Sequence, residues 1–360
     1  MRKTLFSVVT AAAMAVGAHL APASAAELGA TYEEILAGAK EEGRLVVWSN
    51  FPSRPETHQA LIAAFNERFG LETELEWVPL SSPQANSRAI AEAAGRQVSV
   101  DVIGAGSIGE VKVASDGGII TPYDWVGVFG EQFPEIGEVD GPAEFEGLAL
   151  SYFVAHSVMG WNPGMIEGEE VPNSWFEVAD SKWAGKFSAN AYWFWPLPVL
   201  SLCIGEEESY ALADKFIANT PVLGKGSPAV NQAITTGQVP IGFTLSLVAA
   251  NSLRKEEPLD FKMFRDYLPY WDNYLWALDG SPNPNTARLF SAWMAVEGYK
   301  VADPIEPLPS RLDSDNIFVK MMADQEAATG AQTCTMETSE DIAQMDRVRQ
   351  TVSAKMSGQQ

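Results

Sequence analysis

The sequence has little cysteine and little positive charge. Its 360 residues contain two cysteines, which excludes a fold held together by many disulfides. Lysine and arginine number 24 against 47 aspartates and glutamates, so the formal net charge is −23. Nucleic acids and anionic membrane surfaces need a footprint of basic side chains, so we expect neither as a partner. Hydrophobic residues make up 46%, which is ample for a packed core.

Residues 1–25 read as a secretory signal peptide. Arg2 and Lys3 precede an apolar run from Leu5 to Leu20, and Ala23-Ser24-Ala25 has the small-x-small pattern of a cleavage site. The apolar run is short for a membrane anchor, and no later stretch is long and apolar enough to span a membrane. Cleavage leaves 22 basic and 47 acidic residues, a net charge of −25. We therefore expect an exported protein that works in the periplasm.

The two cysteines are 131 positions apart. Cys203 lies in an apolar run typical of a buried core, and Cys334 lies in a polar segment. In an oxidising compartment the two thiols can pair, but sequence alone does not place their Cα atoms within bonding distance. The sequence alone therefore does not decide whether this disulfide forms.

Helices and strands alternate along the first third of the mature chain. Thr31 and Glu34 have the spacing of a capping box, and apolar residues recur at helical period up to Gly43. The pattern predicts helices over 31–42, 56–70 and 86–94, and strands over 45–48, 73–78 and 100–103. This order indicates an α/β fold with a mostly parallel sheet. Ligands bind at the carboxyl ends of such strands, which points to residues 49–54 and 104–107.

The pattern resumes after a segment rich in glycine, proline and acidic residues. The apolar stretch 148–161 is long enough for an extended crossover between two regions. A second α/β region follows over roughly 153–273, with helices expected at 208–219 and 229–236. Another helix is expected at 286–297. The length also indicates about two domains.

Residues 104–109 read Gly-Ala-Gly-Ser-Ile-Gly, a match to G-x-G-x-x-G after a strand. One interpretation is a dinucleotide-binding turn, with Asp124 as the acid that binds a ribose, in an exported oxidoreductase. A second is a tight turn from strand to helix, and a third is a turn whose N–H groups hold a small ligand. The motif follows the third strand rather than the first, which disfavours the dinucleotide interpretation.

Few residues point to catalysis. Only His58 and His156 follow the signal segment, neither has metal-ligand spacing, and no G-x-S-x-G motif occurs. We therefore expect no enzyme activity, no cofactor and no metal. Aromatic residues gather at 192–195 and 267–276, where they suit core packing or the wall of a ligand cleft.

Five segments span the mature chain in a recognisable order: 42–49 (EGRLVVWS), 64–70 (AFNERFG), 182–186 (KWAGK), 231–242 and 282–290 (PNPNTARLF). This ordered set resembles the extracellular solute-binding proteins of ABC transporters. The subgroup in question contains binders of ferric iron, thiamine, phosphonates and sugar phosphates.

The resemblance implies a type II-like protein of two α/β lobes joined by crossover strands. Lobe 1 would comprise residues 26–152 and about 274–322, and lobe 2 about 153–273 and about 323–360. The family binds a small-molecule solute in the cleft between its lobes and delivers it to a membrane permease. The resemblance implies that the protein catalyses no reaction on this solute, and we expect a monomer.

Ferric binders of this subgroup carry an adjacent tyrosine pair after an Ile-Gly segment. Here Gly242 is followed by Phe243 and Thr244, which supply no phenolate. We therefore expect an organic solute, thiamine-like or another cationic or zwitterionic molecule. An anionic solute remains open, because Arg54 and loop N–H groups can bind one.

Positions carried over from the family give the candidate site. They lie on the loops after the first and third strands, on an aromatic wall, at a helix start, at the place of the tyrosine pair, and beside the cleft: Ser49, Asn50, Arg54, Ala105, Gly106, Ser107, Tyr192, Trp193, Ser227, Ala229, Phe243, Thr244, Tyr270 and Tyr274.

Overall fold

The N-terminal elements form where the sequence patterns place them. The computed structural model describes residues 27–191, 194 and 196–358. Helix α1 (Tyr32–Glu42) begins after Thr31, which forms the expected capping box with Glu34, and it ends at Gly43 in the left-handed region (φ 61°). Strand β1 (Arg44–Trp48) follows and is buried after its first residue. Alternation of helix and strand then continues as predicted.

The first lobe is built on three parallel strands in the order β2–β1–β3. The helix expected at 86–94 starts earlier, because Pro83 suits the first turn of a helix. Besides α1 and β1, this lobe contains α2 (Pro55–Phe69), β2 (Glu74–Val78), α3 (Ser82–Ala94), β3 (Val102–Gly106), α4 (Ile108–Asp116), α5 (Trp125–Phe129), α11 (Pro284–Trp293) and α12 (Tyr299–Ala302).

The second lobe has strands in the order β4–β7–β5–β6, and β8 pairs with the opposite edge of the same end of β4. Its strands are β4 (Leu150–Trp161), β5 (Phe187–Asn190), β6 (Val222–Gly224), β7 (Ile241–Leu245), β8 (Asp260–Lys262) and β10 (Gln332–Cys334). Its helices are α6 (Trp175–Val178), α7 (Leu197–Ile204), α8 (Glu206–Ala218), α9 (Ser227–Thr235), α10 (Ser246–Arg254), α13 (Ile317–Thr329) and α14 (Ser339–Ser357).

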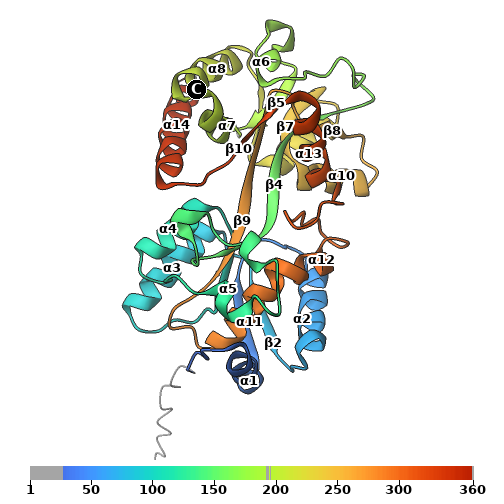
Figure 1. The fold of residues 1–360 in the computed structure, drawn as a ribbon. Coiled ribbons are helices and arrows are strands. Elements are labelled where there is room, and N and C mark those ends of the chain that lie inside the picture. The colour runs from blue at the N-terminus through green and yellow to red at the C-terminus, as the bar shows by residue number, and fades with distance from the viewer. Residues whose placement is uncertain (1–26, 192–193, 195, 359–360) are drawn as a thin grey trace, which may run out of the picture.

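Two long strands connect the lobes, β4 and β9 (Tyr267–Ala277), which stand upright between them in Figure 1. They pair antiparallel from Leu150↔Leu275 to His156↔Tyr270. Beyond this stretch β4 pairs with β7, and the other end of β9 pairs with β3. The apolar stretch 148–161 is thus a crossover, as its length predicted.

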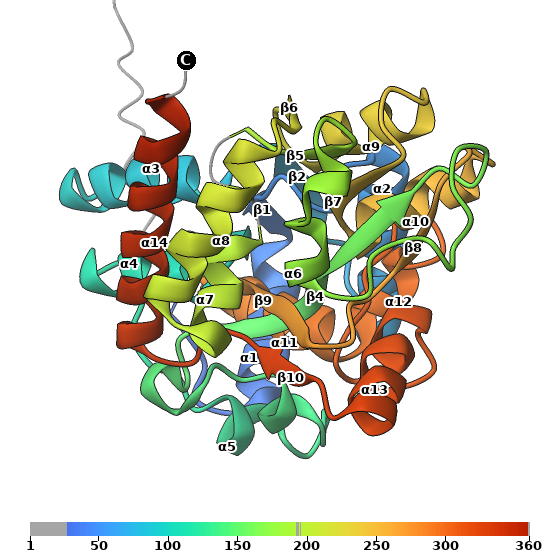
Figure 2. The same cartoon turned by 90° about the horizontal axis from the view of Figure 1, so that it is seen from above.

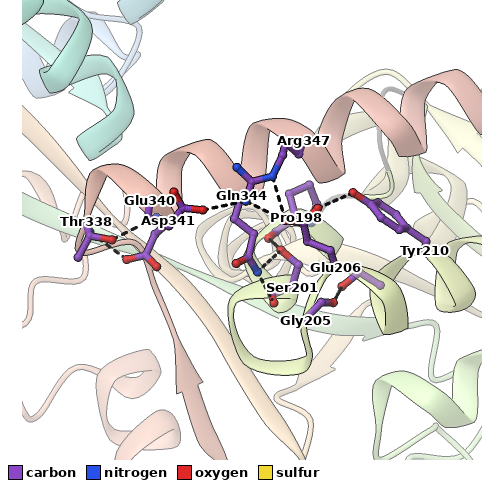
Figure 3. Close-up of polar contacts among 11 residues, drawn as sticks. Pro198, Ser201, Gly205, Glu206, Tyr210, Thr338, Glu340, Asp341, Gln344 and Arg347 are labelled. Atoms are coloured by element: carbon purple, nitrogen blue, oxygen red, sulfur yellow. Dashed lines mark hydrogen bonds and ion pairs between the residues drawn. The ribbon is translucent and has the colours of Figure 1, made fainter.

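The C-terminal segment packs on the second lobe and is held there by a disulfide. Cys203 at the end of α7 is bonded to Cys334 of β10, with Cα atoms 5.7 Å apart. Helix α14 then runs beside α7 and α8, as the view from above shows (Figure 2). Gln344 donates to the Ser201 carbonyl oxygen at 2.7 Å, and Arg347 pairs with Glu206 (Figure 3).

Two negative findings apply to the part of the chain that the structure describes. Within those residues, no helix combines the length and the apolar character that a membrane span requires. The same residues contain no cluster of three or more His, Cys, Asp or Glu side chains placed to hold a metal ion.

Candidate ligand-binding groove

The carboxyl ends of the parallel strands in the two lobes face each other along β4. Gly106 at the end of β3 pairs with Tyr274, which in turn pairs with Ser151 of β4. Leu245 at the end of β7 pairs with Ser157, six residues further along β4. At about 3.3 Å per residue, these two sets of strand ends are roughly 20 Å apart. This is where open α/β sheets bind ligands.

A groove of about 630 Å³ lies between the lobes at this level. The first lobe contributes Ser107 and Gly109 of the β3–α4 turn, together with Pro83 near the start of α3. The second lobe contributes Pro198 of α7 and residues of α14, and Trp271 of β9 completes the wall. A groove lined by both lobes can gain contacts when they close around a ligand.

Charged side chains at the groove are paired with one another. Lys112 contacts Asp116 at 2.7 Å, and Arg349 contacts Asp346 at 2.7 Å. Burial raises the pKa of Glu110, in the first turn of α4, and the nearby Arg349 opposes that shift. Lys112 and Arg349 are therefore already engaged with carboxylates of the protein.

Helix α14 links the two lobes at the rim of this groove. The backbone N–H of Ser339 donates to a Glu144 carboxylate oxygen at 2.8 Å, and the Ser339 hydroxyl donates to the other oxygen. Glu144 belongs to the first lobe, whereas the body of α14 packs on α7 and α8. On another part of the lobe boundary, Arg254 of α10 donates to the Asp303 carbonyl oxygen at 2.9 Å.

The loop after β1 satisfies its polar groups internally. The Ser49 hydroxyl donates to the Phe51 carbonyl oxygen at 2.6 Å. The buried Glu306 carboxylate accepts the N–H groups of Ser53 and Arg54 at 2.9 and 3.1 Å. The Arg54 guanidinium donates to the Ile305 carbonyl oxygen. Of the three candidates here, only Asn50 has an exposed side chain without an internal bond among the described residues.

The β3–α4 turn contains three further candidates and is shaped by packing. Ala105 adopts the left-handed region (φ 59°) where β3 bulges against β9. A Cβ atom on Gly106 would lie 2.5 Å from the ring of Trp276, so a glycine is required there. Ser107 is the N-cap of α4 and lines the groove. A bulge at Ala105 and a close ring contact at Gly106 thus account for the shape of this turn.

Two glycines of this motif should respond in opposite ways to alanine. Gly106→Ala should lower the free energy of unfolding by about 1–3 kcal/mol, because its methyl group overlaps the Trp276 ring. Gly109→Ala should raise it by about 0.5–1 kcal/mol, because Gly109 lies in a helix with room for a Cβ atom. Urea unfolding of both variants tests this, and equal stability of G106A and wild type would contradict the packing argument.

The β9 tyrosines lie on the strand face opposite Trp271. Side chains alternate along a strand, so Tyr270 and Tyr274 share a face with Asp272, while Trp271 of the groove shares the other face with Asn273. Burial raises the pKa of Tyr270 to about 12, and it raises the pKa of Tyr274 as well. Next to Tyr270, burial lowers the pKa of His156 to about 4.

The remaining candidates lie in the second lobe. Phe243 packs in an aromatic core with Trp175, Phe187 and Phe216. Thr244 is buried, and its hydroxyl finds no partner within the described ranges. Ser227 and Ala229 lie in the first turn of α9, whose N-cap is Gly226. Tyr192 and Trp193 lie outside the described residues.

Sequence reasoning did not choose Trp271 as a site residue, although it lines the groove. Trp271 lies in the aromatic segment 267–276, but the two tyrosines chosen there, Tyr270 and Tyr274, lie on the opposite face of the strand. The register between β4 and β9, in which Ala155 pairs with Trp271, decides which side chains of β9 face the groove. The sequence of β9 alone does not give this register. The one feature of the sequence that could have pointed to Trp271 is the frequent occurrence of tryptophan in ligand clefts.

Comparison of the sequence with protein-family models and with curated proteins finds no match. Solved structures do resemble the fold. Iron-bound HitA of Pseudomonas aeruginosa is 18% identical, with a TM-score of 0.64 over 85% of this chain and 99% of that one. An ABC transporter substrate-binding protein of Bradyrhizobium japonicum is 14% identical, with a TM-score of 0.65 over 86% of this chain and 99% of that one.

A third similar structure is the periplasmic binding protein AfuA of Actinobacillus pleuropneumoniae with fructose-6-phosphate bound. It is 15% identical, with a TM-score of 0.60 over 87% of this chain and 97% of that one. The resemblance stated from sequence motifs is confirmed at the level of the fold. This chain has the two-lobe α/β fold of periplasmic solute-binding proteins of ABC transporters.

Proposed function

We propose that the protein captures a small organic solute in the interlobe groove and delivers it to the permease of an ABC import system. The observation that carries this proposal is the groove itself, which is lined from both lobes at the carboxyl ends of their strands. The similar solved structures bind solutes or are named for that role. Their fold at nearly full coverage supports transport rather than catalysis, and nothing favours the dinucleotide-dependent alternative.

The location and organisation follow from the same proposal. Cleavage of the signal segment would release a monomer into the periplasm. From the sequence we placed one lobe at 26–152 and about 274–322, and the other at about 153–273 and about 323–360. We propose to move the second boundary to 316/317, before α13, because Phe318 of that helix packs on Phe261 of β8 with 5.4 Å between ring centres.

A thermal-shift screen of the mature chain tests the proposal. A ligand that binds only the folded state stabilises it by about 4 kcal/mol at a thousandfold excess over its Kd. We expect one class among amino acids, polyamines, thiamine, phosphonates and sugar phosphates to raise the unfolding midpoint. Small-angle scattering should then show a smaller radius of gyration with that solute bound. Stabilisation by NAD alone, with turnover of a substrate, would overturn the proposal.

A further inference from the structure

Helix α14 is fastened to the second lobe along most of its length. Val348, near its middle, is fully buried. Arg347 pairs with Glu206 of α8 at 2.8 Å, and Lys355 pairs with Asp214 of the same helix at 2.6 Å. Just before α14, the disulfide between α7 and β10 ties the chain to this lobe as well. Helix α14 and the second lobe therefore form one unit.

The first turn of α14 also contacts the first lobe. Glu144 lies in a short 3₁₀ helix of that lobe, Ala143–Phe145. One of its carboxylate oxygens accepts the backbone N–H of Ser339 at 2.8 Å, and the other accepts the Ser339 hydroxyl. These hydrogen bonds lower the pKa of Glu144, so its carboxylate is ionised at neutral pH. A negative charge at this end of a helix is also favoured by the helix dipole.

Helix α14 does not need Glu144 as a cap. The Thr338 hydroxyl accepts the N–H of Asp341 at 3.1 Å, and the Asp341 carboxylate accepts the N–H of Thr338 at 2.9 Å. This capping box satisfies the start of the helix from within its own sequence. The Ser339 N–H lies outside the box, and its acceptor comes from the other lobe. The Glu144–Ser339 contact therefore serves the connection between the lobes rather than the formation of the helix.

A second contact between the lobes lies one turn further along α14. A Cβ atom on Gly109 of α4 would lie 3.6 Å from Cγ2 of Ile342, which is ordinary van der Waals contact. Helix α14 thus reaches two elements of the first lobe. Ser339, Ile342 and Gly109 all line the groove between the lobes. A rotation that opens the groove on this side therefore separates both contacts.

The hydrogen bond across the lobe boundary at α10 is the weaker connection. There the Arg254 guanidinium donates to the Asp303 carbonyl oxygen at 2.9 Å. Arg254 is exposed, and a long exposed side chain loses much rotational freedom when it is held in one geometry. Glu144 instead engages two donors of one residue with its two oxygens, and an ionised acceptor makes a stronger hydrogen bond than a neutral one. Glu144 is therefore the firmer of these two connections.

We propose that Glu144 and Ser339 form a latch that holds the two lobes together beside the groove. The latch consists of groups of the protein alone, so it acts whether or not a solute is bound. It shifts the free protein toward the closed arrangement of the lobes, and a larger closed population raises the apparent affinity for a ligand that binds this arrangement. The effect on solute capture rests on the proposed import function, whereas the latch itself does not.

Removing either half of the latch tests this inference without any solute. Glu144→Ala removes the acceptor from the first lobe. Ser339→Pro removes both donors from the second lobe, and proline suits this first helical position because the preceding Thr338 is extended. Glu146→Ala is the matched control, since Glu146 is an exposed glutamate two residues from Glu144 and makes no hydrogen bond to α14 within the described ranges.

Small-angle scattering of the mature chain, with no solute added, measures the closure, and circular dichroism checks that each variant is folded. We expect E144A and S339P to have a larger radius of gyration than wild type and E146A. The double variant E144A/S339P should match the larger of the single variants, because both remove the same hydrogen bonds. Equal radii for E144A and wild type, or a double variant expanded by the sum of the single effects, would overturn the latch. A screen that identifies no solute would count against the import function and not against the latch.

Discussion

Removal of the Cys203–Cys334 disulfide should lower the free energy of unfolding by about 3–5 kcal/mol. The bond closes a loop with a sequence separation of 131 residues, so it restricts the unfolded chain strongly. It also joins α7, whose start lines the groove, to β10, which pairs with the crossover strand β9. Export to an oxidising compartment would keep this bond formed.

Urea unfolding of the mature chain, with and without dithiothreitol, measures this effect. The double variant Cys203→Ser/Cys334→Ser is the control, because reductant should leave its midpoint unchanged. We expect reduced wild type and the double variant to unfold at similar, lower urea concentrations. A double variant as stable as oxidised wild type would contradict the stabilising role of the disulfide.

Arg311→Met should lower the free energy of unfolding by about 2–3 kcal/mol at neutral pH. The Asp272 carboxylate on β9 is 6% exposed and is held by the Arg311 guanidinium at 2.9 Å and the Ser151 hydroxyl at 2.8 Å. Loss of Arg311 leaves that buried charge without its counter-ion. The Arg311 side chain is itself 35% exposed, so solvent reduces the effect below that of a fully buried pair.

The difference in free energy of unfolding between wild type and R311M should become smaller as the pH falls. Burial raises the pKa of Asp272, and Arg311 opposes that shift, so removing Arg311 raises the pKa further. A protonated Asp272 does not need a counter-ion, so the difference from wild type is largest above the raised pKa and fades below it. Arg265→Met, at an exposed arginine, controls for the substitution, and Asp272→Asn should rescue R311M. A deficit that is unchanged at low pH would contradict this account.

Local patterns in the sequence predicted the elements of the fold well. The capping box at Thr31, the glycine stop at Gly43 and the apolar strand after it formed as expected, because each depends on residues within one turn. Strand β3 shifted from 100–103 to 102–106, since its pairing with β9 and not its hydrophobicity sets its end. The crossover over 148–161 was recognisable from the length of its apolar run.

The groove was harder to derive, because it depends on long-range contacts. The side chains of Ser49 and Arg54 suit a binding loop, yet their hydrogen bonds go to Phe51 and Ile305. The local sequence does not indicate that Glu306, about 250 positions away, accepts hydrogen bonds from the backbone N–H groups before α2. Likewise, the register between β9 and β4 determines that Trp271 rather than Tyr270 faces the groove.

The most direct test of the proposed function is a crystal structure of the mature chain with the solute that the screen identifies. The account predicts that the solute lies between the lobes, in contact with the β3–α4 turn of one lobe, with α14 of the other and with Trp271 of β9. A solute bound only in the outer groove beside Trp183, which a single lobe lines, would contradict the central claim.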